Sequence, residues 1–465
     1  MNDTPPRQPN QAKDKKVRAV ASAVLNDGTL VEMVYQPDQH RTFLCMLKDG
    51  KVVHEPSILH NGERIVPYSP GNNLLAHDVV LFPSEPIDYG SEQDLVRAIQ
   101  AFIHTYVDVS PLFEQIASHY VVFSWVYDSF NELPYLRLRG DTGSGKTRCL
   151  LTIGSLCYKP IFASGASTVS PLFRIMDSFQ GTLIVDEGDF RFSDEKAEII
   201  KILNNGNARG FPVLRSESVS GKEFDPRAYT VFGPKMIATR NVFEDRALET
   251  RCLTEETGGR TLRGDIPLNL TADFKTQSQE LRNKLLMFRL RYFGARRIDP
   301  TLIDRTIEPR LAQLFAPLMS VISDSDARDA LRDLAREYHR ELIADRGMDM
   351  EAQVLEIIRD TLATSLDGRV SVSAIACHFA EQHGGEYDRK ITPKWIGNII
   401  RRNLQLKTQK SNGVFVLIPG EKAKLRTLYE KYGIVATAVL PQTEASDCKP
   451  RSAGDMGDVG DFHCV

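Results

Sequence analysis

Residues 140–147 match the signature of a loop that holds the phosphates of a nucleotide. The pattern GxxxxGK[ST] is satisfied at every specified position. In such a loop the glycines let backbone N–H groups converge on phosphate oxygens, the lysine places a positive charge at the β- and γ-phosphates, and the last hydroxyl is a ligand for Mg²⁺. The sequence therefore predicts a nucleotide and Mg²⁺ site formed by Gly140, Asp141, Thr142, Gly143, Ser144, Gly145, Lys146 and Thr147.

Two acidic residues follow an apolar run forty residues after the lysine of this loop. The run is Gly181-Thr-Leu-Ile-Val, and Asp186 and Glu187 end it. Alone, this pattern is typical of any strand that meets a loop. After a complete P-loop it predicts that Asp186 binds Mg²⁺, directly or through water, and that Glu187 orients and deprotonates the attacking water. No guanine signature of the NKxD type follows, so we expect ATP.

The surrounding elements predict an α/β core that positions both motifs. The run at 135–139 reads as a strand entering the loop, and the apolar run at 149–157 reads as the helix leaving it. A further strand at 160–163 separates the loop from the acidic motif. This layout, with a glutamate directly after the aspartate, resembles the additional-strand P-loop ATPases rather than kinases or Ras-like GTPases.

Beyond the acidic motif, the chain resembles the AAA+ superfamily. A strand at 235–239 ends in Thr239, Arg240 and Asn241, and a short helix at 243–250 follows it. In that superfamily a polar residue at the end of the fourth strand acts as a sensor of the nucleotide. The resemblance implies this role for Asn241, with Thr239 and Arg240 as alternatives.

The same resemblance implies arginines that act on ATP. Arg251 stands directly before a strand at 252–254, where AAA+ proteins place an arginine finger that reaches into the neighbouring subunit. Such a finger can be worth roughly 10³–10⁵ in rate and ties hydrolysis to assembly. Arg246 competes for this role, and a surface ion pair is the other interpretation of Arg251. Arg310 opens a later helix and is the candidate for a second sensor at the ATP of its own chain, with a solvated charge as the alternative.

Within this superfamily, residues 90–440 resemble helicase-like and initiator-like ATPases of phages and other mobile elements, some of superfamily III type. The segments that carry the resemblance are PYLRLRGDTGSGKTR, FRIMDSFQGTLIVDE and ALETRCL, together with a C-terminal winged helix. The resemblance implies a homo-oligomeric ring, expected to be a hexamer, that acts on DNA. Two other classes stay open: an ATP-switched winged-helix regulator, and a protein-remodelling ATPase.

The rest of the chain predicts several domains around the ATPase core. Alternating runs broken by Asp-Gly turns indicate a small β-rich domain before the core, and helical spacing indicates a linker and a helical lid on either side of the core. We expect a multi-domain α/β protein with a disordered tail at 1–17, the β-rich domain at 18–88, a helical linker at 89–131, the AAA+ core at 132–261, the helical lid at 262–345, a winged helix at 346–420, a helix at 421–440 and a disordered tail at 441–465.

The predicted winged helix carries the strongest local positive charge. Between residues 389 and 426 there are ten Lys and Arg against one acidic residue, although the whole chain has a net charge of −3. This asymmetry is typical of a surface that contacts the phosphates of DNA, with a protein-binding winged helix as the alternative. The candidate DNA contacts are Lys394, Asn398, Arg401 and Arg402 on the third helix, and Lys407 and Lys410 on the wing.

A second DNA-binding candidate lies between the acidic motif and the sensor strand. Two β-like runs within 211–232 flank a polar tip, as in AAA+ helicases that insert a hairpin into a central pore. The resemblance implies that Lys222, together with Arg215, contacts DNA there. An inert connecting hairpin is the alternative, because the tip also carries acidic residues.

Composition limits the setting in which this chemistry would operate. The 465 residues contain 58 Lys and Arg against 61 Asp and Glu, and 42% of them are hydrophobic, which is typical of a globular protein. Seven cysteines without a CxxC pair argue against a disulfide framework and a structural zinc site. No run approaches 18 apolar residues, so we expect a cytoplasmic protein without membrane contact.

Overall fold

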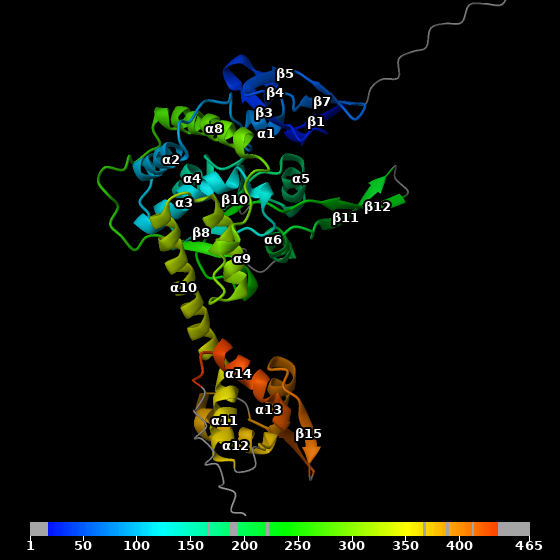
Figure 1. The fold of residues 1–465 in the computed structure, drawn as a ribbon, viewed down its shortest axis with the longest axis vertical. Helices are drawn as coiled ribbons and strands as arrows, with labels where there is room; N and C mark the ends of the chain where they lie inside the picture. The colour runs from blue at the N-terminus through cyan, green and yellow to red at the C-terminus, as the bar shows by residue number, and fades with distance from the viewer. Residues whose placement is uncertain are drawn as a thin grey trace, which may run out of the picture. The chain divides into compact units, whose positions relative to one another are not determined.

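The computed structural model describes residues 17–164, 167–186, 194–219, 223–365, 369–386, 390–411 and 413–435. These residues divide into two compact units, with the boundary between His339 and Arg340 (Figure 1). The domain boundaries predicted from the sequence are finer than this division and stay predictions.

A five-stranded parallel sheet forms the centre of the first unit. Its strands lie in the order β14-β8-β13-β10-β9, so β13 separates the strand that enters the P-loop from the strand that carries the acidic motif. This is the additional-strand arrangement predicted from the sequence, with one strand inserted between the P-loop strand and the acidic strand of a parallel sheet. The strands are β8 (Tyr135–Arg139), β9 (Ile161–Ser164), β10 (Leu183–Asp186), β13 (Lys235–Thr239) and β14 (Cys252–Glu256).

Four helices connect these strands. All strands of the sheet are parallel, so each connection must cross over a face of the sheet, and the apolar side chains of strands and helices form two large buried clusters. The helices are α4 (Lys146–Gly154), α5 (Val169–Phe179), α6 (Asp194–Asn205) and α7 (Arg246–Glu249). The P-loop lies between β8 and α4, as the sequence predicted for the strand that enters the loop and the helix that leaves it.

Two small sheets form the N-terminal part of the same unit. One has the strand order β2-β3-β4-β5 and is antiparallel, and the other has the order β1-β7-β6. The turns at Gly28 and Gly50 adopt positive φ angles, as Asp-Gly turns between strands require. The elements are β1 (Val17–Val20), β2 (Ser22–Val24), β3 (Leu30–Gln36), β4 (Arg41–Lys48), β5 (Lys51–Glu55), β6 (Ile58–His60), β7 (Glu63–Pro67) and α1 (Asn73–Ala76).

The N-terminal strands are fused to the central sheet by backbone contacts. Val80 forms an antiparallel bridge with Ile161 of β9, and the amide of Phe162 donates to the carbonyl of Val79 at 2.9 Å. Residues 79–81 therefore cover the β9 edge of the central sheet.

A buried charge network also joins the N-terminal strands to the ATPase core. Glu32 of β3 is 1% exposed, and its carboxylate accepts from the Tyr158 hydroxyl and from Nε of Arg289, both at 2.7 Å, and pairs with Nζ of Lys159 at 3.2 Å. Arg289 donates onward to Asp128 at 2.7 Å. The network connects β3, the segment between α4 and β9, and α8 through side chains that are all removed from water, except for the partly buried Asp128.

Five longer helices complete the first unit. Ser91 and Asp94 form a capping box at the start of α2, and Ser110 caps α3 directly before Pro111. The linker helices α2 (Glu92–Tyr106) and α3 (Pro111–Ser124) precede the core, and α8 (Ala272–Tyr292), α9 (Pro309–Val321) and α10 (Ser325–Gly347) follow it, with α10 running on into the second unit.

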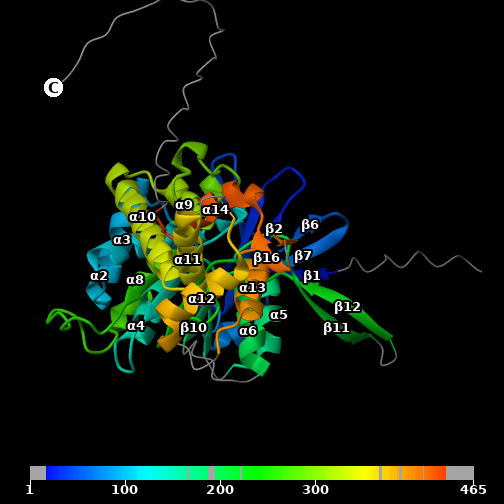
Figure 2. The same ribbon diagram turned by 90° about the horizontal axis from the view of Figure 1, so that it is seen from below.

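A two-stranded hairpin lies between the acidic motif and β13. The strands β11 (Val213–Val219) and β12 (Glu223–Tyr229) pair antiparallel, with Val213 opposite Tyr229. Both views show the hairpin projecting from the body of its unit (Figures 1 and 2). Its base is anchored by Arg215, which pairs with Glu198 at 3.0 Å and stacks over the ring of Phe173.

The second unit contains three helices, a hairpin and a final helix around its own core. Thr392 caps α13 directly before Pro393, with its hydroxyl accepting from the Trp395 amide. A bridge between Ser371 and Val416 adds the start of α12 to the hairpin. The elements are α11 (Met350–Thr364), α12 (Val372–His383), α13 (Pro393–Asn398) with a π-helical turn at Ile399–Asn403, β15 (Thr408–Ser411), β16 (Val414–Leu417) and α14 (Lys422–Lys431). Across the described residues of both units, no helix is long and apolar enough to span a membrane.

Candidate nucleotide and nucleic-acid sites

The P-loop has the backbone that its glycines make possible. Gly143 and Gly145 adopt φ angles of 81° and 88°, and a Cβ placed on Gly140 would lie 2.4 Å from the carbonyl oxygen of Thr257. The Lys146 ammonium group lies within the loop and donates to the carbonyls of Gly140 at 2.6 Å and Asp141 at 2.7 Å. The loop therefore holds a fixed positive charge at the N-terminus of α4, where an anion is favoured.

The structure brings together the two predicted Mg²⁺ ligands. The Thr147 hydroxyl, at the start of α4, donates to Oδ2 of Asp186, at the end of β10, at 2.7 Å. Two oxygen ligands at this separation fit a Mg²⁺ ion that completes its shell with phosphate oxygens and water. Glu187, predicted as the residue that activates water, lies outside the described residues, so its role stays a prediction.

A cavity of about 480 Å³ adjoins the P-loop and could hold the rest of a nucleotide. Residues 141–145 form one side, and residues 106–108 of the linker and residues 255–268 form the others. Arg148 of α4 ties two of these walls together, because its Nε donates to the carbonyl of Tyr106 at 2.8 Å and its Nη1 to that of Leu268 at 2.9 Å. The phosphate-loop signature ends at Thr147 and so does not mark this arginine, although it is the next residue.

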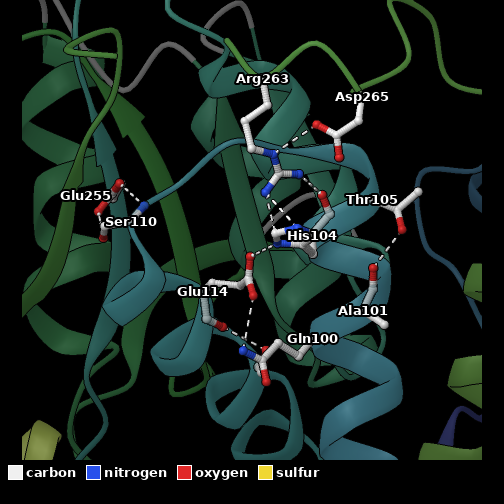
Figure 3. A network of polar contacts seen from close by, with 10 residues as sticks. Gln100, Ala101, His104, Thr105, Ser110, Glu114, Glu255, Arg263 and Asp265 are labelled. Atoms are coloured by element: carbon white, nitrogen blue, oxygen red, sulfur yellow. Dashed lines mark hydrogen bonds and ion pairs between the residues drawn. The ribbon is translucent and has the colours of Figure 1, made fainter. Parts of the chain in front are cut away.

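Polar contacts fix the walls of this cavity, as Figure 3 shows in part. The buried Glu255 of β14 accepts from the amide and the hydroxyl of Ser110, both at 2.6 Å, and so attaches the start of α3 to the central sheet. Arg263 donates to the ring of His104 at 2.9 Å, and His104 contacts Glu114 at 2.8 Å. These contacts hold α2, α3 and the segment after β14 in one arrangement.

The end of β13 lies beside the P-loop, as the sensor prediction requires. The amide of Gly140 donates to the carbonyl of Thr239 at 3.2 Å, and Thr239 is 1% exposed. Its hydroxyl has no hydrogen-bond partner among the described residues. Asn241, the first choice from the sequence, lies two residues beyond the end of β13 and is exposed. The geometry therefore favours Thr239 over Asn241 as the polar group nearest the loop.

Arg251 lies at the opposite end of the central sheet from the P-loop. Its carbonyl accepts from the amide of Tyr135, the first residue of β8, whereas the P-loop follows the last residue of β8. The five residues of β14 separate these two levels by about 17 Å at 3.3 Å per residue. Arg251 therefore cannot reach the P-loop of its own chain, which is the placement expected of a residue that acts on a neighbour.

The Arg251 side chain is held by a polar residue of α6 that belongs to no sequence motif. Its Nη1 donates to Oδ1 of Asn204 in α6, and Nδ2 of Asn204 donates to Asp245 at 2.5 Å. Burial lowers the pKa of the Arg251 guanidinium, and the positive charge of Arg310 lowers it further. The predicted alternative for Arg251, an ion pair with Glu249 or Glu255, is not present: Glu249 bonds Arg137, and Glu255 bonds Ser110 and Arg260.

The effect of Arg310 on the pKa of Arg251 shows that the two side chains lie near each other. Arg310 stands in the first turn of α9, near enough to Arg251 to act on its charge, and its neighbours in sequence border a cavity with Glu132, which precedes β8. The placement argues against the predicted contact of Arg310 with the ATP of its own chain, because the lid folds the start of α9 to the end of the sheet remote from the P-loop.

The DNA-binding candidates of the second unit gather on α13 and the hairpin. Arg401 is exposed, but its guanidinium stacks over the ring of Phe415 on β16, 5.4 Å from the centroid, and lies 3.5 Å from the hydroxyl of Thr408. Asn398 is half-buried. The other exposed basic candidates here are Lys394, Arg402, Lys407 and Lys410. Lys222, at the tip of the other hairpin, lies outside the described residues.

No protein-family model and no curated protein matches the sequence. Among solved structures, the chain is similar to the C-terminal region of NrS-1, at 12% identity and a TM-score of 0.35, over 83% of this chain and 96% of that one. It is also similar to Cch of SCCmec type IV, an active helicase, at 10% identity and a TM-score of 0.35, over 88% and 99% of the two chains. A full-length MCM homolog from Methanopyrus kandleri matches at 11% identity and a TM-score of 0.31, over 67% and 76%. TM-scores this low carry no argument about function, and the assignment of the fold rests on the sheet order and the P-loop.

Proposed function

We propose that the chain is a Mg²⁺-dependent AAA+ ATPase that acts on DNA as a homo-oligomeric ring, as a helicase or replication-initiator-like motor of a mobile element. The observation that carries the proposal is the contact between Thr147 and Asp186 at 2.7 Å beside an intact P-loop, with an additional strand between the two motifs. These residues are oxygen ligands at the end of a parallel sheet where a triphosphate would lie on the N-terminus of α4.

Each residue of the site has a definite task in this proposal. The loop amides and Lys146 bind and orient the phosphates, and Arg148 keeps the walls of the base cavity in place through the carbonyls of Tyr106 and Leu268. Mg²⁺, bound by Thr147 and Asp186, would supply charge neutralisation at the β- and γ-phosphates. Glu187 accepts the proton of the attacking water, and Thr239 or Asn241 contacts the γ-phosphate side of the site.

Arg251 completes the site of the neighbouring subunit. Its position about 17 Å from the P-loop of its own chain supports an action in trans, and Arg310 would lie at the same subunit boundary. Subunits mixed in equal amounts test this directly. Lys146→Ala and Arg251→Ala should each hydrolyse little ATP alone, whereas a mixture should regain activity, because some intact P-loops then face an intact Arg251.

A mixture of Lys146→Ala with Glu187→Gln is the matched control. Both of these residues serve the nucleotide of their own chain, so this mixture should regain no activity. If the Arg251→Ala mixture also stays inactive, or if Arg251→Ala alone hydrolyses ATP at the wild-type rate, Arg251 is not a finger supplied in trans.

The basic surface of the second unit is the proposed DNA contact, made by Lys394, Asn398, Arg401, Arg402, Lys407 and Lys410, with Lys222 as a contact within the ring. The deciding experiment measures ATP hydrolysis with and without single-stranded and forked DNA, on the wild type beside Glu187→Gln. Stimulation by DNA that disappears in Glu187→Gln supports the motor. Hydrolysis that no DNA changes would contradict it, and would favour the remodelling or regulatory ATPase instead.

A further inference from the structure

A second, larger cavity lies in the first unit, between α8 and the N-terminal strands. Its volume is about 1060 Å³, and its lining shares no residue with the cavity at the P-loop. One wall consists of apolar side chains from α1, from the segment after it, and from α4 and β9. The apolar residues that matter here are Leu75, Val80, Phe82, Leu151 and Phe162.

The opposite wall is α8, and it contains a buried arginine. Arg282 is 5% exposed, and its Nη1 donates to the carbonyl of Ser155 at 2.8 Å while its Nη2 donates to Oε1 of Gln279 at 2.6 Å. Its Nε has no hydrogen-bond partner, and no carboxylate lies within ion-pair distance, among the residues that the structure describes. Burial lowers the pKa of Arg282 to about 10.

This arrangement is unusual for an arginine removed from water. A buried guanidinium is normally paired with a carboxylate, because amide and carbonyl dipoles alone offset only part of the cost of desolvating the charge. The carboxylate of Asp78 attracts this charge from outside ion-pair distance, and it is itself paired with Lys275 at 3.0 Å. Arg282 therefore has no carboxylate of its own in direct contact among the residues that the structure describes.

The remaining charges of the cavity limit the charge of a ligand. Asp38, Asp78 and Glu280 also line it, and Lys275 is the other basic residue there. These carboxylates would repel a polyanion such as DNA. A ligand with one negative charge, placed at Arg282, would instead be attracted by the buried guanidinium. The apolar wall requires that the rest of the ligand be hydrocarbon-like.

We propose that this cavity binds a monoanionic carboxylate with an apolar body, its carboxylate paired with Arg282 and its body against the apolar wall. A free long-chain carboxylate and the C-terminus of an apolar peptide share this chemistry. Because Arg282 also holds the carbonyl of Ser155, directly after α4, an occupant would contact the same helix that begins at the P-loop. The site is independent of ATP and DNA, so it can be tested without either.

The test measures binding of decanoate to the full chain by calorimetry, with decanol and decyltrimethylammonium as probes that lack the negative charge. Decanoate should bind saturably, and both control probes at least tenfold more weakly. Arg282→Gln, which removes the positive charge and keeps a polar side chain, should weaken decanoate binding by roughly 10- to 100-fold, the loss expected of one charge-assisted bond. Arg282→Lys, which keeps the charge, should weaken it less.

Two further measurements keep the outcome interpretable. Leu151→Trp, which adds bulk on the apolar wall and leaves Arg282 intact, should also lower the affinity for decanoate. A fluorescent ATP analogue serves as the control for folding, because it should bind every folded variant with equal affinity. An acetylated peptide ending in Leu-Phe, compared with its C-terminal amide, distinguishes the peptide source from the free carboxylate. Equal affinity for the three decyl probes, an unchanged affinity in Arg282→Gln, or no binding of either carboxylate would overturn the proposal.

Discussion

Replacement of Glu32 by glutamine should reveal how firmly the N-terminal strands are joined to the ATPase core. The change keeps the shape of the side chain and removes its charge, which leaves Lys159 buried without its ion-pair partner, while Arg289 keeps Asp128. Removing one member of a buried ion pair costs about 3–5 kcal/mol. The first unit spans 339 residues and so has an unfolding entropy of about 0.7 kcal/mol/K, and Tm should therefore fall by about 4–7 °C.

Differential scanning calorimetry on the wild type and two variants measures this. Glu63→Gln is the matched control, because Glu63 is also on an N-terminal strand but pairs with Arg18 at the surface, and it should move Tm by less than about 1 °C. The pH dependence gives a second check. Burial lowers the pKa of Lys159 to about 8, and loss of Glu32 lowers it further, so Glu32→Gln should recover stability as the pH is raised from 7 to 9.

The sign of that recovery follows from proton binding. The unfolded chain keeps Lys159 protonated up to a pKa near 10.5, whereas the folded variant releases the proton at lower pH, so the unfolded state binds more protons across the interval. A Tm loss as small as that of Glu63→Gln would refute the reasoning, because it would mean that the buried network contributes nothing to folding.

Three other changes have definite expected results. Burial lowers the pKa of Lys235 to about 7 against 10.5 for the unfolded chain, so this group should raise the free energy of unfolding by about 1.5 kcal/mol from pH 7 to 8.5, and in urea unfolding the rise of Lys235→Met should be smaller than that of the wild type by this amount, because Lys159 adds to the rise in both. Gly140→Ala should abolish binding of a fluorescent ATP analogue while the chain stays folded, because the new Cβ would collide with the Thr257 carbonyl at 2.4 Å. Replacing both Arg401 and Arg402 by alanine should weaken DNA binding and reduce its salt dependence by about two counterions, with basal ATP hydrolysis unchanged, as fluorescence anisotropy at several salt concentrations can show.

The nucleotide-binding part of the site could be predicted from the sequence because local residue types determine it. Glycines with positive φ, a lysine and a hydroxyl at fixed spacing form the loop without help from distant residues, and the apolar run before Asp186 specifies a strand of the same sheet. Parallel strands present their carboxyl ends at one edge, so the meeting of Thr147 with Asp186 followed from the pattern.

Other residues could not be placed because tertiary packing decides their surroundings. Glu32 stands in the run LVEMVY, where alternation predicts a solvent-exposed side chain. In the structure both faces of β3 are covered, and five residues of this strand are buried. Arg251 is held by Asn204, which lies 47 residues earlier on another helix. Arg310 lies in the first turn of α9, and Arg282 lies within α8. No local pattern specifies how these helices pack on the rest of the unit. The sequence around a charged residue also does not show whether that residue will be buried.

The bridge between Val80 and Ile161 has a consequence for how the protein can be shortened. A strand at the end of a sheet presents unpaired N–H and C=O groups, and these recruit other chains unless something covers them. Here residues 79–81 cover the β9 edge and Val80 also fills the apolar cluster beneath it. A shortened chain that begins at residue 89 would keep every motif of the ATPase but expose this edge, and self-association would compete with the ring in which the enzyme is proposed to work.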